Sequence, residues 1–340
     1  MITVKKEGVI LQTTDLEFEN EGVLNPAIVK EGNTVHLFYR AVRKGNISTI
    51  GYCKLDGPLK ITTRLIAPLL SPEHDYEKHG MEDPRIVKID ELYYLSYIAF
   101  DGNDALGAVA TSTDLQHFTK QGIIVPQLKC GEFDKLAKGN ADIIERYRRD
   151  YGNPDIIMMD KDVVFFPRRI NGKLTFLHRI KPDIQIVAVN NLDELTDDFW
   201  KDYITNLKYN ILLTSKYLHE ISYVGSGCPP IETAHGWLII YHGVEHLNEG
   251  YKYSACAALF DLDNPQKEIA RLPYALFSPD QDYELAGDVD NVCFPTGTAL
   301  FDDMLYIYYG AGDDIIACAS VSLSALVAEL LSFSAPQTMA

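Results

Sequence analysis

The sequence has little positive charge. It contains 31 Lys and Arg against 48 Asp and Glu, which gives a formal net charge of −17 at pH 7. Nucleic acids are bound by a surplus of basic residues that meet the phosphate backbone, so the composition argues against a nucleic-acid partner. The same balance favours an uncharged or cationic ligand, unless basic residues are concentrated at one point.

The sequence also lacks long apolar runs and paired cysteines. No run approaches the roughly 20 apolar residues that span a bilayer, and the first residues lack the apolar core of a signal peptide. We therefore expect a cytoplasmic protein that does not enter the membrane. The six cysteines are scattered and form no CxxC pair, which favours buried free thiols over disulfides or a metal site.

Three short catalytic motifs are absent as well: a GxSxG turn for a serine nucleophile, a glycine-rich phosphate loop and an HExxH zinc pair. What the sequence does contain is apolar and aromatic. Hydrophobic residues make up 46% of the chain, with 20 Tyr and 14 Phe. Such a composition can bury enough apolar surface to offset the entropy of ordering, so it excludes a disordered chain.

The sequence contains a repeat of roughly 60 residues. Each of five copies has a proline, then a turn, an aromatic-rich strand and a small-residue strand; the prolines are Pro26, Pro84, Pro167, Pro230 and Pro295. Turns between alternating apolar runs indicate β-hairpins. This period, with three or four strands per unit, fits propeller blades better than a solenoid. The sequence therefore predicts an all-β fold, a five-bladed β-propeller that forms one domain over residues 1–340.

Two helical additions are expected. The second repeat interval is longer than the others, and its surplus lies in a charged stretch at about 130–155 with helical periodicity. This insertion is either a solvated helix at the rim or a lid or oligomer contact beside the site. The tail at about 323–340 begins with a closing helix from Leu323 to Leu331. Both segments are candidate contacts of a homo-oligomer.

Polar residues recur where the strands of the repeats end. A propeller brings corresponding strand ends to one central funnel, so these residues should converge: Asn25, Arg40, Arg43, Glu82, Asp83, Arg85, Asp101, Lys161, Asp162, His178, Arg179, Tyr223, Tyr241, His242, Glu245, Asp313 and Asp314. Carboxylates and arginines among aromatic rings suit sugars.

For the two histidines, we favour hydrogen-bonding roles over metal ligation, because neither has a close His or Cys partner in sequence. Glycosidic cleavage needs an acid to protonate the leaving oxygen, then a second carboxylate or an external nucleophile.

At these residues the sequence resembles glycoside hydrolase family 130, the mannoside phosphorylases and related β-mannosidases. The matching segments include NPAI from Asn25, MEDPRIVKIDELYYLSYIAFDG from Met81, KDVVFFPRRINGKLTFLHRI from Lys161 and VGSGCPPIETAHGWLIIYHGV from Val224. They follow in order along nearly the whole chain. The resemblance implies a five-bladed β-propeller, in agreement with the repeat.

The resemblance also implies an inverting attack on a β-mannosyl unit, without metal or organic cofactor. Asp101 matches the family's general acid, which protonates the leaving oxygen through a sugar hydroxyl; taken alone, it could equally form a turn before Gly102. The matches to the mannose site are Asn25, Arg40, Asp83, Arg85, Asp162 and Asp313. We add His178, Tyr241 and His242 as expected substrate contacts.

Phosphorylases use inorganic phosphate as co-substrate, and Lys161 and Arg179 match two of the family's phosphate contacts. Tyr223 departs from the pattern, since phosphorylases commonly have lysine there, although its hydroxyl can still donate to phosphate. The two retained cations favour a phosphorylase that converts β-1,4- or β-1,2-linked mannooligosaccharides, or mannosyl-glucose, to α-mannose 1-phosphate. One alternative is an inverting β-1,2-mannosidase with Glu220 or Glu245 as base. The other is a carbohydrate-binding propeller without activity.

Overall fold

The computed structural model describes residues 2–138, 141–148 and 153–334, and these are mostly β-strand. One four-stranded sheet comprises β1 (Lys5–Leu11), β21 (Ile315–Ser322), β20 (Met304–Ala311) and β19 (Cys293–Phe301). A second comprises β10 (Lys161–Phe165), β11 (Leu174–Arg179), β12 (Ile184–Val189) and β13 (Ile211–Leu213). A third comprises β14 (Tyr223–Ser226), β16 (Gly236–His246), β17 (Tyr251–Phe260) and β18 (Glu268–Arg271), with β15 (Ile231–Thr233) paired to β16.

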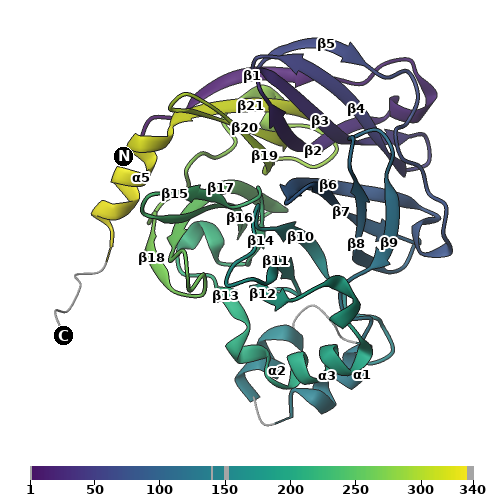
Figure 1. Ribbon diagram of the computed structural model, residues 1–340, viewed down its shortest axis with the longest axis vertical. Helices are drawn as coiled ribbons and strands as arrows, with labels where there is room; N and C mark the ends of the chain where they lie inside the picture. The colour runs from purple at the N-terminus through teal and green to yellow at the C-terminus, as the bar shows by residue number, and fades with distance from the viewer. Residues whose placement is uncertain (1, 139–140, 149–152, 335–340) are drawn as a thin grey trace.

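The largest sheet consists of two antiparallel groups. The first group contains β2 (Gly22–Glu31), β3 (Thr34–Arg43), β4 (Ile47–Asp56) and β5 (Lys60–Arg64). The second contains β6 (Gly80–Ile89), β7 (Leu92–Phe100), β8 (Ala105–Ser112) and β9 (Thr119–Ile123). A parallel pairing of Ser48 with Gly80 joins the groups. Figure 1 shows the sheets side by side around the middle of the molecule, with β2, β6, β10, β14 and β19 innermost.

The chain closes on itself through its first strand. β1 pairs antiparallel with β21, so a strand from the N-terminus completes the sheet that the C-terminal strands begin. The cores lie between neighbouring strand groups: Phe38 of β3 shares a buried cluster with Leu95 of β7, and Val164 of β10 shares another with Trp237 of β16. Fully burying one such side chain contributes about 1.5–3 kcal/mol. The six cysteines are free and buried, as expected.

A buried glutamate recurs near the innermost strands, which the sequence repeat did not reveal. It lies in a short helical turn: η1 (Glu17–Glu19), η2 (Asp75–Glu77), η5 (Leu218–Glu220) or α4 (Asp282–Leu285). Each glutamate accepts a hydrogen bond from a tyrosine of the second strand and pairs with a cation of the outermost strand. These glutamate–tyrosine–cation triads are Glu19–Tyr39–Arg64, Glu77–Tyr97–Lys120, Glu220–Tyr241–Arg271 and Glu284–Tyr309–Lys6.

The helical insertion is confirmed for the residues that the structure describes. It contains α1 (Cys130–Leu136) and α2 (Ala141–Arg148), and Figure 1 shows both beside α3 (Asp197–Thr205) at one edge of the molecule. The other short turns are η3 (Leu192–Glu194) and η4 (Leu207–Tyr209). Tyr147 of α2 donates a hydrogen bond to the buried Asp183 carboxylate at 3.0 Å, which ties the insertion to the sheet. Residues 139–140 and 149–152 of the predicted insertion lie outside the described residues.

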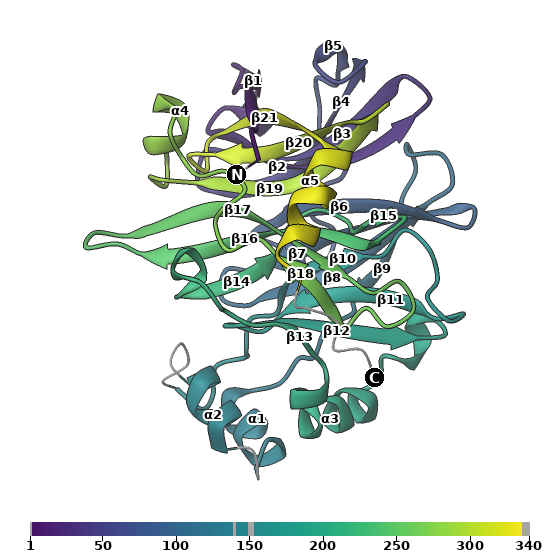
Figure 2. The same ribbon diagram turned by 90° about the vertical axis from the view of Figure 1, so that its left-hand side faces the viewer.

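The closing helix is also confirmed. It is α5 (Leu323–Ser332), and its buried Leu326 and Leu330 belong to a cluster with Leu259 of β17 and with Leu272, which directly follows β18. Figure 2 shows α5 lying across the side of the molecule, over these strands. The rest of the predicted tail, 335–340, lies outside the described residues. Among the helices described, none has the length and apolar character needed to cross a membrane.

Candidate functional site

A cavity of about 570 Å³ lies where the innermost strands meet. Its wall includes nine of the sequence-predicted site residues, which come from five separate parts of the chain: Asn25, Arg40, Asp83, Lys161, Asp162, Arg179, Tyr223, His242 and Asp313. The structure thus brings together residues nearly 300 positions apart in the sequence.

Local backbone irregularities aim several of these side chains. The pairing register of β2, β6 and β10 shifts at Asn25, Asp83 and Asp162 respectively, so each lies in a β-bulge. Their φ angles are 51°, 46° and 55°, and Asp313, just after β20, has a φ of 52°. Asn and Asp tolerate this left-handed conformation better than other non-glycine residues. Because a bulge leaves its extra residue unpaired and re-aims the side chain, the repeated bulge places polar groups at the cavity.

One part of the wall is a network of carboxylates around a single arginine. Arg40 donates from Nη2 to Glu82 Oε1 at 2.8 Å, and its Nη1 lies 3.6 Å from Asp83 Oδ1. Asn25 Nδ2 donates to the same Asp83 oxygen at 2.7 Å. Burial raises the pKa of Glu82, and it raises the pKa of Asp313 to about 6 although Arg40 opposes it. This region offers several oxygen acceptors for sugar hydroxyls.

The other part of the wall combines cations, phenols and a neutral imidazole. Arg179 Nε donates to the buried Asp162 Oδ2 at 2.5 Å. The Tyr223 and Tyr253 hydroxyls share a hydrogen bond of 2.6 Å. Burial lowers the pKa of His242 to about 3, so its imidazole is neutral at neutral pH. Neither of its ring nitrogens has a hydrogen-bond partner among the described residues, which leaves one donor and one acceptor for a ligand.

Three predicted substrate contacts lie outside the cavity wall. Tyr241 and His178 directly precede His242 and Arg179, and successive side chains of a strand point to opposite faces. They therefore point away from the cavity. Tyr241 forms a hydrogen bond with Glu220, and His178 forms hydrogen bonds with Asp160 Oδ2 at 2.7 Å and Tyr203 Oη at 2.8 Å.

The third of these residues, Arg85, is buried behind the wall. It donates from Nε to the Gly227 carbonyl oxygen at 2.7 Å and from Nη1 to the Asp83 carbonyl oxygen at 2.8 Å. Arg85 thus links the bulge of Asp83 to the backbone just after β14, and its Nη2 has no hydrogen-bond partner among the described residues.

Asp101 follows β7 at the same end of the sheet as Glu82, but it is outside the described cavity wall. Its Oδ1 accepts hydrogen bonds from the backbone N–H groups of Asn103 and Asp104, both at 2.8 Å. The hydrogen bond from Asp104, followed by that from Asn103, lowers the pKa of Asp101 despite partial burial. The structure therefore shows the turn-forming arrangement that the sequence left open.

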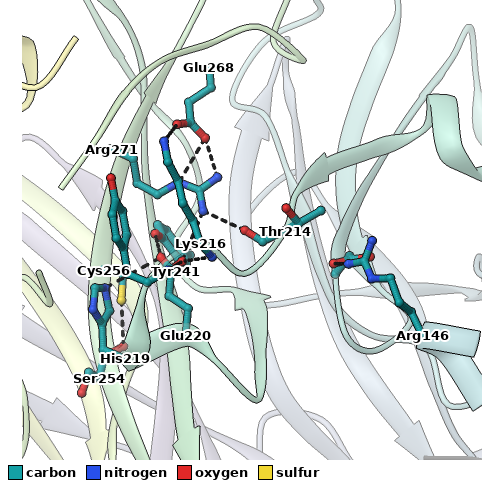
Figure 3. A network of polar contacts seen from close by, with 12 residues as sticks. Arg146, Thr214, Lys216, His219, Glu220, Tyr241, Ser254, Cys256, Glu268 and Arg271 are labelled. Carbon is teal, nitrogen blue, oxygen red and sulfur yellow. Dashed lines mark hydrogen bonds and ion pairs between the residues drawn. The ribbon is translucent and has the colours of Figure 1, made fainter. Parts of the chain in front are cut away.

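The two candidate bases also lie outside the described cavity wall. Glu220 is fully buried in its triad, where its Oε2 lies 3.3 Å from Arg271 Nη1 and accepts the Lys216 backbone N–H at 2.8 Å (Figure 3). Glu245 forms an ion pair with Lys252 at 2.5 Å. Neither carboxylate is placed to activate a water molecule in the cavity.

One cluster near Glu220 has metal-ligating atoms within 4.8 Å of one another: His219, Glu220 and Cys256. Two features oppose a cation there. Arg271 already neutralises the glutamate, and burial raises the pKa of the Cys256 thiol well above its usual value, so the thiolate that a metal needs is disfavoured. The cluster is better explained as part of the triad shown in Figure 3.

Several cavity residues were not assigned a role from the sequence. Glu82 appeared only as a strand-end carboxylate. Tyr253 of β17 and Lys181, just after β11, lie outside the strand ends that the sequence repeat marks. Ile156 and Met159 come from the segment that follows the helical insertion. An apolar pair on the wall suits the less polar face of a sugar ring. The segment directly after the insertion therefore lines the cavity, and the role of the insertion itself stays a prediction.

The protein is built from β-sheets, and its cavity wall has carboxylates that suit sugar hydroxyls beside a group of cations. The family model of glycoside hydrolase family 130, described as β-1,4-mannooligosaccharide phosphorylase, matches residues 9–331. The chain belongs to this family.

Two relatives from Thermoanaerobacter sp. (strain X514) are each 32% identical. A 1,2-β-oligomannan phosphorylase aligns over 95% of this chain and 98% of its own length, and a β-1,2-mannobiose phosphorylase over 90% and 91%. A solved structure of β-1,2-mannobiose phosphorylase from Listeria innocua, in complex with β-1,2-mannobiose, is 22% identical with a TM-score of 0.74, covering 97% of this chain and 99% of that one. This likeness shows a shared fold.

Proposed function

We propose that the strands form the five blades of one β-propeller domain. The support is the division of the strands into five antiparallel groups: β2–β5, β6–β9, β10–β13, β14 with β16–β18, and β19–β21 with β1. Each group has its innermost strand at the middle of the molecule (Figure 1). In this interpretation, β1 closes the ring by supplying the outer strand of the last blade, a common way to remove exposed sheet edges.

We propose that the protein is an inverting phosphorylase that cleaves β-mannosides with inorganic phosphate. The observation that carries this proposal is the cavity wall itself, where Lys161 and Arg179 stand beside the carboxylate network of Arg40 in a chain of net charge −17. Arginine forks and lysine point charges suit phosphate, and carboxylates suit sugar hydroxyls. The names of the two full-length relatives favour β-1,2-linked mannosides as substrates.

In the proposed reaction, a phosphate oxygen attacks the anomeric carbon as the glycosidic bond breaks. The leaving oxygen receives a proton from Asp101 through a sugar hydroxyl, and the proton carried by phosphate restores the acid through solvent. Because backbone hydrogen bonds lower the pKa of Asp101 in the free protein, this step requires the bound sugar to raise that pKa. The products are α-mannose 1-phosphate and a shortened sugar. Mannose is held by Asn25, Arg40, Asp83, Asp162, His242 and Asp313, and phosphate by Lys161, Arg179 and Tyr223.

Hydrolysis is the second candidate, because some mannosides are cleaved by water in related enzymes of this fold. It requires a base that can reach a water molecule at the anomeric carbon. The carboxylates of Glu220 and Glu245 are engaged away from the described wall, whereas Glu82, Asp83 and Asp162 are paired with arginines. Asp313, the remaining carboxylate of the described wall, interacts with the charge of Arg40. The geometry therefore favours phosphate as the nucleophile.

The test is turnover of a panel of β-1,2- and β-1,4-linked mannobioses, with and without inorganic phosphate. We expect the β-1,2-linked disaccharide to be consumed only when phosphate is present. Equal rates in both conditions would support hydrolysis, and no turnover of any mannoside would support a binding module instead.

A pH dependence of sugar binding is expected from Asp313. Its pKa of about 6 means that the carboxylate loses its charge as the pH falls through that value. A hydrogen bond to a charged acceptor is worth about 1.5–3 kcal/mol, so mannobiose affinity should fall roughly tenfold or more at acid pH. Calorimetric titration without phosphate, between about pH 5 and pH 8, measures this. Asp313→Asn should bind weakly with a flat profile, and Asp314→Asn should keep the wild-type profile; a flat wild-type profile would contradict the assignment.

A further inference from the structure

Four basic residues stand on the cavity wall among the described residues, and at least two of them are paired with carboxylates. Arg40 is paired with Glu82, and Arg179 with Asp162. A phosphate dianion bound beside these acidic groups needs further positive charge, because the carboxylates offset the arginines. The other two cations of the wall are Lys161 and Lys181. Lys181 was not singled out in the sequence.

The position of Lys181 is set by the ring of Tyr223. Its Nζ lies 4.0 Å from the ring centroid, and the Arg179 guanidinium carbon lies 5.2 Å from the same centroid. Tyr223 is buried and its hydroxyl is held by Tyr253, so the ring is a fixed platform. The attraction between a cation and the face of a buried ring localises a side chain that is otherwise long and flexible.

The electrostatic effect of Lys181 also extends into the cavity. Lys181 is one of the positive charges that keep the pKa of the buried His242 low, after burial and the two arginines Arg179 and Arg85. Lys181 and His242 therefore both contribute to the electrostatic environment of the cavity. Its charge stands near the positions where phosphate would meet Arg179 and the Tyr223 hydroxyl.

We propose that Lys181 supplies the cation that Tyr223 does not, and binds the phosphate co-substrate from its place on the Tyr223 ring. The inference rests on the proposed phosphorolysis and names a further phosphate-binding residue for it. Tyr223 then has two roles: it lines the site, with its hydroxyl bonded to that of Tyr253, and its ring holds a lysine from the segment after β11. A tyrosine at this position is thus compatible with the use of phosphate.

The test is the kinetics of Lys181→Met with phosphate and mannobiose varied separately. Loss of a charged hydrogen bond should raise the KM for phosphate by roughly ten- to hundredfold and leave the KM for mannobiose within about threefold. Lys181→Arg should keep most of the phosphate affinity. The double variant Lys181→Met with Tyr223→Lys should recover it, because the cation returns from the neighbouring position.

The matched control is Lys208→Met, which removes a lysine that lies 4.8 Å above the ring of Tyr209 on the exposed surface. It makes the same change in net charge and in cation–ring contact, and it should leave both KM values unchanged. A phosphate-induced rise in melting temperature should be present in the wild type and in this control, and reduced in Lys181→Met.

Two results would overturn the inference while the proposed function stands: an unchanged phosphate KM in Lys181→Met, or an equal rise in both KM values. A wild-type enzyme that cleaves mannobiose at the same rate without phosphate would instead contradict the proposed function. The melting temperature of Lys181→Met without phosphate shows whether the variant is folded, so that a folding defect is separated from a binding defect.

Discussion

Asp101→Asn is expected to lower kcat for mannobiose by about 10²–10⁴-fold, the usual contribution of a general acid. The substitution suits this test because an asparagine oxygen can accept the same hydrogen bonds from the Asn103 and Asp104 backbone, so the turn is kept. Steady-state kinetics at saturating phosphate measures the loss. The melting temperature should stay close to that of the wild type.

Leaving-group chemistry separates an acid from a binding residue. A β-mannoside with an acidic leaving group, such as a dinitrophenol, needs little protonation, so Asp101→Asn should cleave it nearly as fast as the wild type. Asp114→Asn is the matched control, because Asp114 also caps a turn, accepting the Gln116 and His117 N–H groups at 2.9 and 2.8 Å. Asp101→Asn turnover within about threefold of wild type on mannobiose would contradict the assignment. If Asp313→Asn instead lost turnover of mannobiose and kept turnover of the dinitrophenyl mannoside, Asp313 would be assigned as the general acid.

Glu220→Gln is expected to destabilise the protein by about 3–5 kcal/mol, because it leaves a buried arginine with part of its charge uncompensated. The affected partner is Arg271, which is 5% exposed. Activity per folded molecule should stay close to wild type. Chemical denaturation together with active-site titration measures the two quantities separately.

Two controls sharpen this prediction. Glu77→Gln breaks the equivalent triad with Tyr97 and Lys120 and should destabilise by a similar amount, although Glu77 was never a candidate base. Glu245→Gln removes a half-exposed ion pair, which is worth about 0–1 kcal/mol. If folded Glu220→Gln and Glu245→Gln together lost turnover while Glu77→Gln kept it, a catalytic base among them would be indicated and hydrolysis favoured.

The repeat in the sequence predicted the antiparallel hairpins because each copy contains a complete hairpin, whose turn and alternation are local signals. The closing strand was not predicted. Lys5–Leu11 precedes the first proline repeat, and its partner β21 lies at the other end of the chain, so local pattern carried no information on the pairing. The triad of Glu284 shows the same limit, since its cation, Lys6, comes from β1.

The convergence of the strand ends at the candidate site could be predicted from the sequence. The direction in which each side chain points was predicted less well. His178–Arg179 and Tyr241–His242 were both taken as pairs of contacts, although alternation allows one residue of each pair to face the cavity. That rule was available from the sequence alone. The position of Lys181 could not be predicted in this way. It depends on the ring of Tyr223, which lies far along the chain and contacts Lys181 only in the folded protein.

The central claim is inverting phosphorolysis, and its most direct test is the identity of the products. The wild-type enzyme would be incubated with β-1,2-mannobiose and inorganic phosphate, and followed by phosphorus and proton NMR. We predict that mannose and α-mannose 1-phosphate appear in equal amounts from the first time point, with no cleavage when phosphate is omitted. Release of two mannose molecules per disaccharide, at a rate that does not depend on phosphate, would contradict it.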